Sequence, residues 1–199
     1  MKRIAIKPNS EKPCYICVIG GPGSGKTTQS GYICDTFLYE YISTGQLLRQ
    51  AIASQRIQNL EDVKNRMKDG RSIDTDIFLK SLHDAIDRKR EKHIVFDGFP
   101  VNEDNYETWK ANFKDKFKAI FYLEITEDEM KKRLLKRNLR EDDNEISIRN
   151  RIKTFNFETK PLIDYLRNMG QLTIFDGMKT KTELRDEIQS EIKSRVLHK

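Results

Sequence analysis

The sequence feature that most constrains the fold is a glycine-rich segment, residues 20–27, with the sequence GGPGSGKT. It follows residues 14–19, an apolar run that contains the β-branched residues favoured in strands. Residues 26–38, which come next, have the apolar spacing of a helix. A strand, a glycine turn and a helix in this order predict the first unit of a parallel α/β sheet.

The glycine-rich segment has the pattern G-x-x-x-x-G-K-T, which is typical of loops that bind nucleotide phosphates. Glycines let successive backbone N–H groups turn toward phosphate oxygens, and the following helix adds the partial positive charge of its N-terminus. Lys26 is therefore predicted to reach the β- and γ-phosphates of ATP, and the Thr27 hydroxyl to bind Mg²⁺. The predicted ATP-binding residues of this segment, with the residue that follows it, are Gly21, Pro22, Gly23, Ser24, Gly25, Lys26, Thr27 and Thr28.

The rest of the chain alternates strand patterns with helix patterns. Apolar runs predict further strands at residues 93–96, 119–125 and 172–175, with a weaker candidate at 39–42. Helical spacing is found at residues 73–90, 104–113, 127–137, 145–169 and 181–196. The chain is thus predicted to form one α/β domain, residues 14–199, with three layers around a five-stranded parallel sheet. Because residues 45–92 contain no strong strand pattern, they predict a helical insert on this sheet.

Asp97 follows the predicted strand 93–96 directly and begins the sequence DGFP. The carboxyl ends of parallel strands face the ligand crevice of such folds. A carboxylate at this point is predicted to hold Mg²⁺ through the water shell of the ion, together with the Thr27 hydroxyl.

Charge and cysteine content argue against several other functions. The 37 Lys and Arg residues are interspersed with 31 Asp and Glu residues, so the net charge of +6 indicates a solvated surface rather than a nucleic-acid-binding patch. No apolar run approaches the length of a membrane span. Cys14 and Cys17 are three residues apart on a predicted strand, so their side chains should point to opposite faces and cannot share a metal.

These properties predict a cytoplasmic protein, with the nucleus as an alternative location, that binds neither nucleic acid nor a membrane. We expect it to be a monomer. Residues 1–13 contain only a short apolar stretch and are predicted to form a flexible tail.

Beyond the phosphate loop, the chain resembles the adenylate and uridylate–cytidylate kinase family from about residue 14 to the last helix. Residues 43–49, with the sequence STGQLLR, resemble its acceptor-nucleotide motif, and residues 97–100 resemble its second acceptor motif. Residues 175–179, with the sequence FDGMK, resemble the loop that meets the adenine of ATP. The resemblance implies a P-loop kinase with an acceptor-binding insert at about residues 43–92 and a short lid at about residues 138–143.

The same resemblance implies which residues act on the donor nucleotide. Arg133 would lie on the adenine of ATP, Arg137 nearer the phosphates, and Lys179 in the adenine loop. The planar guanidinium fork binds phosphate oxygens in pairs, and the acceptor phosphate, largely a dianion near pH 7, needs no general base. The implied catalytic residues are Lys26, Arg133, Arg137, Arg140 and Arg151.

On the acceptor side, the resemblance implies that Arg49 holds the α-phosphate of the nucleoside monophosphate. The other implied acceptor-binding residues are Thr44, Gly45, Ile73, Gly98, Asn105, Arg140 and Arg151. Residues 101–105, with the sequence VNEDN, followed by Trp109, look more like the uridylate–cytidylate branch, in which Asn105 would read the acceptor base. An Asn amide both donates and accepts hydrogen bonds, as a pyrimidine edge requires. We therefore expect Mg·ATP to phosphorylate UMP or CMP (and dCMP), with an AMP-specific adenylate kinase as the alternative.

Two residues depart from the family pattern on the acceptor side. Val101 stands where the family has an Arg that grips the acceptor phosphate, and Gln46 stands where it has an Asp associated with the water shell of the metal. Arg71 and Arg140 are candidates for supplying the missing guanidinium. The two departures keep open a second class of function, a nucleotide-binding module without useful turnover. A GTPase is disfavoured because the chain lacks the Asn/Thr-Lys-x-Asp motif that reads guanine.

Overall fold

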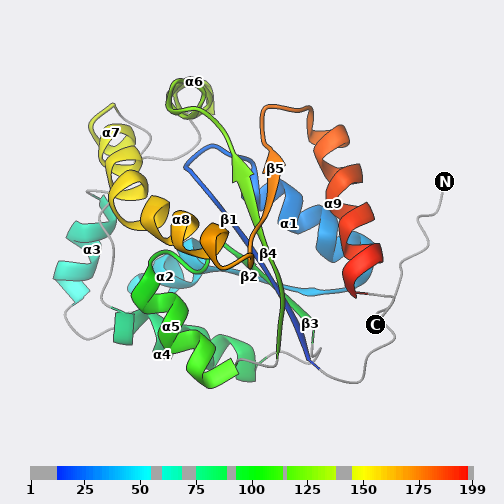
Figure 1. Ribbon diagram of the computed structural model, residues 1–199. Coiled ribbons are helices and arrows are strands. Elements are labelled where there is room, and N and C mark those ends of the chain that lie inside the picture. The colour runs from blue at the N-terminus through cyan, green and yellow to red at the C-terminus, as the bar shows by residue number, and fades with distance from the viewer. Residues whose placement is uncertain are drawn as a thin grey trace.

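The protein is described by a computed structural model, in which residues 13–54, 60–68, 75–88, 93–113, 116–137 and 145–196 are placed (Figure 1). Five strands form one parallel sheet with the order β2-β3-β1-β4-β5. The strands are β1 (Cys14–Gly20), β2 (Glu40–Ser43), β3 (His93–Asp97), β4 (Phe117–Glu124) and β5 (Thr173–Asp176). The five-stranded parallel α/β sheet predicted from the sequence is confirmed, including its weakest strand.

The helices cover both faces of this sheet. Their bounds are α1 (Lys26–Phe37), α2 (Thr44–Ala53), α3 (Leu60–Lys68), α4 (Thr75–Asp87), α5 (Glu103–Phe113), α6 (Glu127–Arg137), α7 (Glu145–Thr154), α8 (Lys160–Asn168) and α9 (Lys181–Val196). A π-helical segment, Phe155–Thr159, joins α7 to α8. In Figure 1, α1 and α9 lie on one side of the sheet, and α4, α5 and α8 lie on the other.

Alternating side chains of β1 divide the core into two parts. Cys14, Ile16 and Val18 are buried in the cluster that includes α1 and α9. Tyr15, Cys17 and Ile19 are buried in the cluster beneath α4, α5 and α8. The two cysteines therefore lie on opposite faces of the sheet, as the two-residue period of a strand requires.

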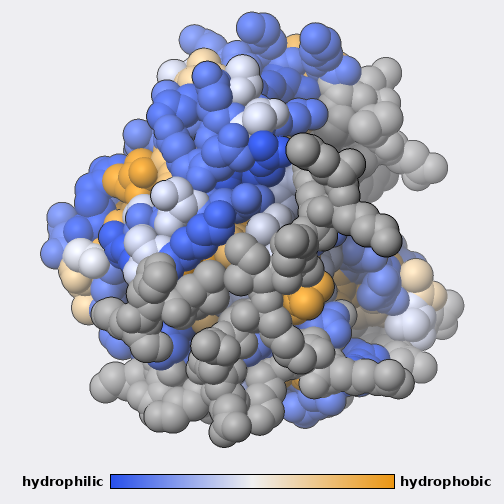
Figure 2. Space-filling model, turned by 90° about the vertical axis from the view of Figure 1, so that its right-hand side faces the viewer, coloured by the Kyte–Doolittle hydropathy of each residue, from blue (hydrophilic) through white to orange (hydrophobic). Residues whose placement is uncertain are grey.

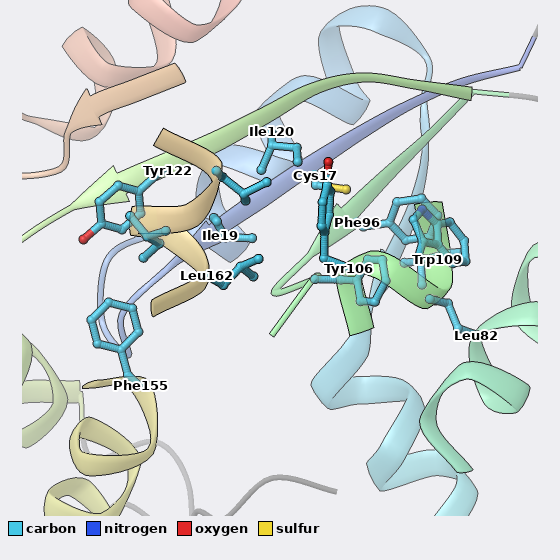
Figure 3. Close-up of a cluster of buried hydrophobic side chains, with 14 of the residues drawn as sticks. Cys17, Ile19, Leu82, Phe96, Tyr106, Trp109, Ile120, Tyr122, Phe155 and Leu162 are labelled. Carbon is cyan, nitrogen blue, oxygen red and sulfur yellow. The ribbon is translucent and has the colours of Figure 1, made fainter. Parts of the chain in front are cut away.

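Trp109 of α5 anchors the second cluster next to the site (Figure 3). Its side chain is fully buried, and its ring lies 5.2 Å from that of Phe96 on β3 and 5.0 Å from that of Phe99. Aromatic rings at such centroid distances pack edge to face and bury large areas. Because Phe99 belongs to the loop after β3, this packing fixes the backbone that carries Asp97 and Gly98.

The predicted helix 145–169 is interrupted by the π-helical segment. Lys160 donates its backbone N–H to the carbonyl of Phe155, five residues earlier. Pro161 follows at the start of α8 and has no N–H for a regular helical bond. The wider π turn accommodates this proline inside an otherwise continuous helix.

Parts of two predicted features lie outside the described residues. These are the predicted lid, residues 138–143, and all of the predicted tail 1–13 except Pro13. In the predicted insert, 43–92, the placed parts form the end of β2 and helices α2, α3 and α4.

The exposed surface agrees with the polar composition of the chain. Figure 2 shows the side of the molecule on which α9 lies, and its described part is mainly hydrophilic, with small separate hydrophobic areas. No helix in the described residues is long and apolar enough to cross a membrane.

Two glycines with equally open surroundings should respond in opposite ways to alanine. A Cβ added at Gly31, inside α1, or at Gly170, after α8, meets no atom within 4 Å, but Gly170 has a φ of +65°. Gly31→Ala should raise the free energy of unfolding by about 0.5–1 kcal/mol, because alanine loses less entropy in a helix. Gly170→Ala should lower it by about 1–2 kcal/mol, because a Cβ is strained in left-handed backbone. Urea unfolding measures both, and equal effects of the two variants would contradict this account.

Candidate active site

A cavity of about 1100 Å³ opens at the carboxyl ends of the strands. Gly20, Ser43 and Asp97, the last residues of β1, β2 and β3, line it. Ligands of open parallel sheets bind at this end of the strands. The predicted site residues that line the cavity are Pro22, Gly23, Ser24, Gly25, Lys26, Thr27, Thr28, Thr44, Gly45, Arg49, Asp97, Gly98, Asn105, Arg133, Arg151 and Lys179.

The phosphate loop connects β1 to α1, and its glycines adopt the conformations predicted for them. Gly23 and Gly25 have φ values of +80° and +93°, and Gly25 is the N-cap residue of α1. Lys26 donates from Nζ to the carbonyl of Gly21 at 3.0 Å. Gly21 itself is buried against α6 and is not part of the cavity wall, because a Cβ there would lie 2.2 Å from the Cε of Met130. The loop is therefore held from behind by α6.

The fold brings together Thr27 and Asp97, the two residues predicted to hold Mg²⁺. The Thr27 hydroxyl donates to Asp97 Oδ2 at 2.7 Å, although the residues are 70 positions apart in the chain. Asp97 is only 4% exposed. Since the threonine proton points to the carboxylate, the lone pairs of Oγ1 point elsewhere and can bind a cation. Two oxygen ligands beside a phosphate loop suit Mg²⁺, which prefers oxygen and binds through few protein groups.

Tyr41 of β2 is a site residue that the sequence did not reveal. Its hydroxyl donates to Asp97 Oδ2 at 2.7 Å, so two hydroxyl groups share one carboxylate oxygen. Burial, and next the hydrogen bond to Asp97, raise the pKa of Tyr41 well above its usual range. The pairing of Ser43 with Asp97 places Tyr41 on the Asp97 face of the sheet. The sequence pattern predicted β2 only weakly and gave no register, so this contact could not be inferred.

Thr44, at the start of α2, connects the predicted acceptor side to the same loop. Its hydroxyl lies 3.0 Å from the carbonyl of Gly98 and 3.2 Å from that of Asp97. Gly98 has a φ of +80°, and a Cβ there would lie 3.2 Å from Thr44 Oγ1. A side chain at position 98 would therefore be strained and would press on Thr44.

Arg133 of α6 joins two loops that are distant in sequence. Its guanidinium donates from Nη2 to the carbonyl of Gly177 at 3.0 Å and from Nη1 to that of Gly23 at 3.5 Å. Its Nε donates to Glu129 Oε1 at 2.7 Å, which fixes the side chain along the helix. The phosphate loop and the predicted adenine loop thus meet at one side chain.

Lys179 lines the cavity, but its ammonium group bonds to Glu187 of α9. That hydrogen bond raises the pKa of Lys179, which keeps the side chain charged. The loop itself is a tight turn, because the backbone N–H of Met178 donates to Asp176 Oδ1 at 2.8 Å. The predicted contact of Lys179 with ATP would therefore compete with an ion pair.

The predicted acceptor residues Arg49 and Asn105 come from two other helices, α2 and α5. Asn105 of α5 is 3% exposed and lines the wall, and its backbone N–H donates to Asn102 Oδ1 at 2.8 Å. Arg49 of α2 lies over Gly45, since a Cβ on that glycine would be 3.4 Å from Nη1. Val101 also lines the cavity, whereas Gln46 is exposed.

Asn102, just before α5, is a second residue that the sequence interpretation missed. It precedes Glu103 and Asp104 in the first turn of the helix, an arrangement typical of an N-cap. An Asn followed by two acidic residues at the start of a helical pattern can be recognised in the sequence as a helix N-cap.

The end of α7 and the π-helical segment supply residues that no motif pointed to. Thr154, Phe155 and Thr159 line the cavity together with Arg151 one turn earlier. π turns inside helices are rare and are frequently found at functional sites. The proline at position 161 was the only sequence signal for this irregularity.

The placement of three predicted residues is not described. Arg140 and Ile73 lie outside the described residues, as does Arg71. Arg137 ends α6, but its side chain is not among those described.

The fold and the site together define a nucleotide-binding protein of the P-loop class. The sequence pattern of the family described as adenylate kinase matches residues 18–171. The chain belongs to the adenylate kinase family.

Several curated proteins are similar to the chain over most of its length. It is 35% identical to UMP-CMP kinase 3 of Arabidopsis thaliana over 187 residues, which cover 94% of this chain and 92% of that protein. It is 32% identical to UMP-CMP kinase of Homo sapiens over 187 residues, which cover 89% of this chain and 95% of that protein. UMP-CMP kinase 1 of Oryza sativa subsp. japonica is also 32% identical, over 94% of this chain and 76% of that protein.

The contact between Gly177 and Arg133 can be tested by substitution. A Cβ at Gly177 would lie 2.7 Å from Ile125 Cγ2 and 2.9 Å from the carbonyl oxygen of Glu124, so an alanine must displace the loop. Gly177→Ala should raise the ATP dissociation constant about tenfold, equivalent to about 1.4 kcal/mol, and should destabilise the fold by about 1–3 kcal/mol. Calorimetric titration with ATP measures the first effect, with Gly31→Ala as the control. An unchanged ATP affinity would contradict the role given to this loop.

Proposed function

We propose that the protein transfers the γ-phosphoryl group of Mg·ATP to UMP or CMP. As a member of the adenylate kinase family, it is a nucleoside-monophosphate kinase. The observation that carries the proposal is that one cavity is lined by the phosphate loop, by Asp97 and by Asn105. Its volume of about 1100 Å³ exceeds the roughly 300–1,000 Å³ typical of sites for one small ligand. A volume at this upper end is compatible with a donor and an acceptor nucleotide bound side by side.

On the donor side, the residues of the phosphate loop would bind the ATP phosphates through backbone N–H groups. Lys26 would exchange the carbonyl of Gly21 for the β- and γ-phosphates, and thereby stabilise charge on the transferring group. Bound Mg²⁺ would neutralise the same phosphates, and the Thr27 hydroxyl and the Asp97 carboxylate would hold it, the latter through water. Arg133 would lie against the adenine, next to Gly177.

On the acceptor side, the phosphate of the monophosphate would be the nucleophile. It needs to be held in line with the γ-phosphate and shielded from water, and it needs no proton acceptor because it is already largely a dianion. Arg49 would hold its α-phosphate, while Thr44, Gly45 and Gly98 would line the ribose side. Arg151 lines the cavity and would contact the transferring group. We assign Arg137 to the ATP phosphates, Arg140 to the transferring group and Ile73 to the acceptor-binding wall.

The acceptor base is assigned through Asn105. Its amide is buried in the cavity wall at the N-terminal end of α5. An amide can donate and accept at once, which matches the edge of uracil or cytosine. The names of the similar proteins from Arabidopsis thaliana and Homo sapiens, UMP-CMP kinases, support the same base.

We also propose that residues 43–92 form the acceptor-binding insert and residues 138–143 a short lid, in a protein that acts as a cytoplasmic monomer. The thiols of Cys14 and Cys17 are buried outside any disulfide, as suits a reducing compartment. Burial raises the pKa of Cys17 well above its usual value, so this thiol stays neutral and unreactive.

The acceptor is tested by ADP release from Mg·ATP with UMP, CMP, dCMP, AMP and GMP, with Lys26→Ala as the blank. We expect the highest turnover with UMP or CMP, because the buried amide of Asn105 pairs with a pyrimidine edge. Highest turnover with AMP would still show phosphoryl transfer to a nucleoside monophosphate, but the assignment of a pyrimidine base would be wrong. ADP at the level of the blank with every acceptor, while ATP still binds, would instead favour a nucleotide-binding module.

The effect of Val101 is tested by restoring the residue of the family pattern. Val101 lines the cavity, so an arginine there could reach the acceptor phosphate. Val101→Arg should raise kcat/KM for the preferred acceptor by up to about a hundredfold, since a single charge-stabilising donor commonly contributes 10²–10³ in rate. Val101→Met is the control for added length without charge. If kcat/KM falls in Val101→Arg but not in Val101→Met, another group already occupies that position.

A further inference from the structure

Three elements of the fold place a hydroxyl or a carboxylate at one point. Thr27 comes from the start of α1, Tyr41 from β2 and Asp97 from the end of β3. Both hydroxyls donate to Asp97 Oδ2 at 2.7 Å. The carboxylate is almost entirely buried, so these bonds are shielded from water.

Both hydrogen bonds end on the same oxygen, and neither occupies Asp97 Oδ1. The terminal torsion of an Asp side chain is soft, and the carboxylate plane turns easily unless other groups hold it. Two donors on Oδ2 from different elements set that plane. Oδ1 is thereby oriented as the oxygen that can accept bonds from the water shell of a cation.

The second consequence concerns the proton of Thr27. A hydroxyl that binds a cation must direct its single proton away from it. The Thr27 proton points to Asp97 Oδ2, whose position Tyr41 also determines. Tyr41 therefore influences both oxygen groups of the predicted metal pair, although it is not among the residues that line the cavity.

We propose that Tyr41 is a positioning residue for the divalent cation, and that its hydroxyl orients Asp97 and thereby sets how strongly the cation promotes ATP binding. The inference rests on the proposed function in so far as the nucleotide is bound together with Mg²⁺. It does not depend on the acceptor, because the three residues lie around the donor phosphate loop.

Tyr39 provides a matched comparison within the same strand region. It precedes Tyr41 by two residues, is 5% exposed, and donates its hydroxyl to Cys14 Sγ at 3.1 Å. Its phenol is thus used in core packing, away from Asp97. If the Tyr41 hydroxyl served packing alone, removal of either phenol oxygen would have the same kind of effect.

The experiment is calorimetric titration of a non-hydrolysable ATP analogue into wild type, Tyr41→Phe and Tyr39→Phe, once with Mg²⁺ and once with EDTA. The quantity compared is the gain in affinity on adding Mg²⁺. Tyr41→Phe should reduce this gain about tenfold, as expected for the loss of a hydrogen bond to a charged group, and should leave the affinity in EDTA within about twofold. Tyr39→Phe should keep the gain of wild type.

Thermal unfolding of each variant confirms that the fold is intact. Tyr41→Met replaces the Phe variant if that variant does not fold, since Met adapts to irregular gaps.

The outcomes separate this inference from the proposed function. An equal gain in wild type and Tyr41→Phe overturns the role of Tyr41, even if the acceptor panel is active. If adding Mg²⁺ does not change the affinity of the wild-type protein for the ATP analogue, both the predicted metal pair and this inference are wrong. An inactive acceptor panel with a normal Mg²⁺ gain that Tyr41→Phe reduces overturns phosphoryl transfer and leaves the inference standing.

Discussion

The parallel pairing of β2, β3 and β1 is the constraint on which the site depends. Asp97 is aligned with Ser43 of β2 and with Val18 of β1, two residues before the first glycine of the phosphate loop. A slip of one residue in either pairing would turn Asp97 to the other face of the sheet. The core secures the register, because the alternating side chains of β1 fill two separate clusters that cannot exchange.

From this alignment the two halves of the cavity follow. The donor side is built from the loop after β1 and held by α6, through Met130 behind Gly21 and Arg133 beside Gly23. The acceptor side is built from the loops after β2 and β3, which Thr44 ties to Gly98. The packing of Phe99 on Trp109 ties this side to the core beneath α5, so the residues proposed for both nucleotides are attached to packed elements.

The sequence predicted the sheet and the phosphate loop, and singled out Thr27 and Asp97 separately, because each of these is a local signal. An apolar run, a glycine pattern and an Asp at the end of a strand can be recognised without knowing the neighbours. Tyr41 could not be predicted, because its role depends on the register between β2 and β3 and its sequence context is only a weak strand. The π-helical segment escaped for a related reason, since helical periodicity does not distinguish a regular turn from a wider one. Asn102, by contrast, had a recognisable capping pattern.

The bridge made by Arg133 has a consequence for how the protein opens locally. Its guanidinium bonds to Gly23 in the first fifth of the chain and to Gly177 near its end. Proteins open locally in cooperative units, and a side chain bonded to two loops favours their opening together. The phosphate loop and the loop after β5 should therefore share one opening free energy, so that their amide hydrogens exchange with solvent at similar protection.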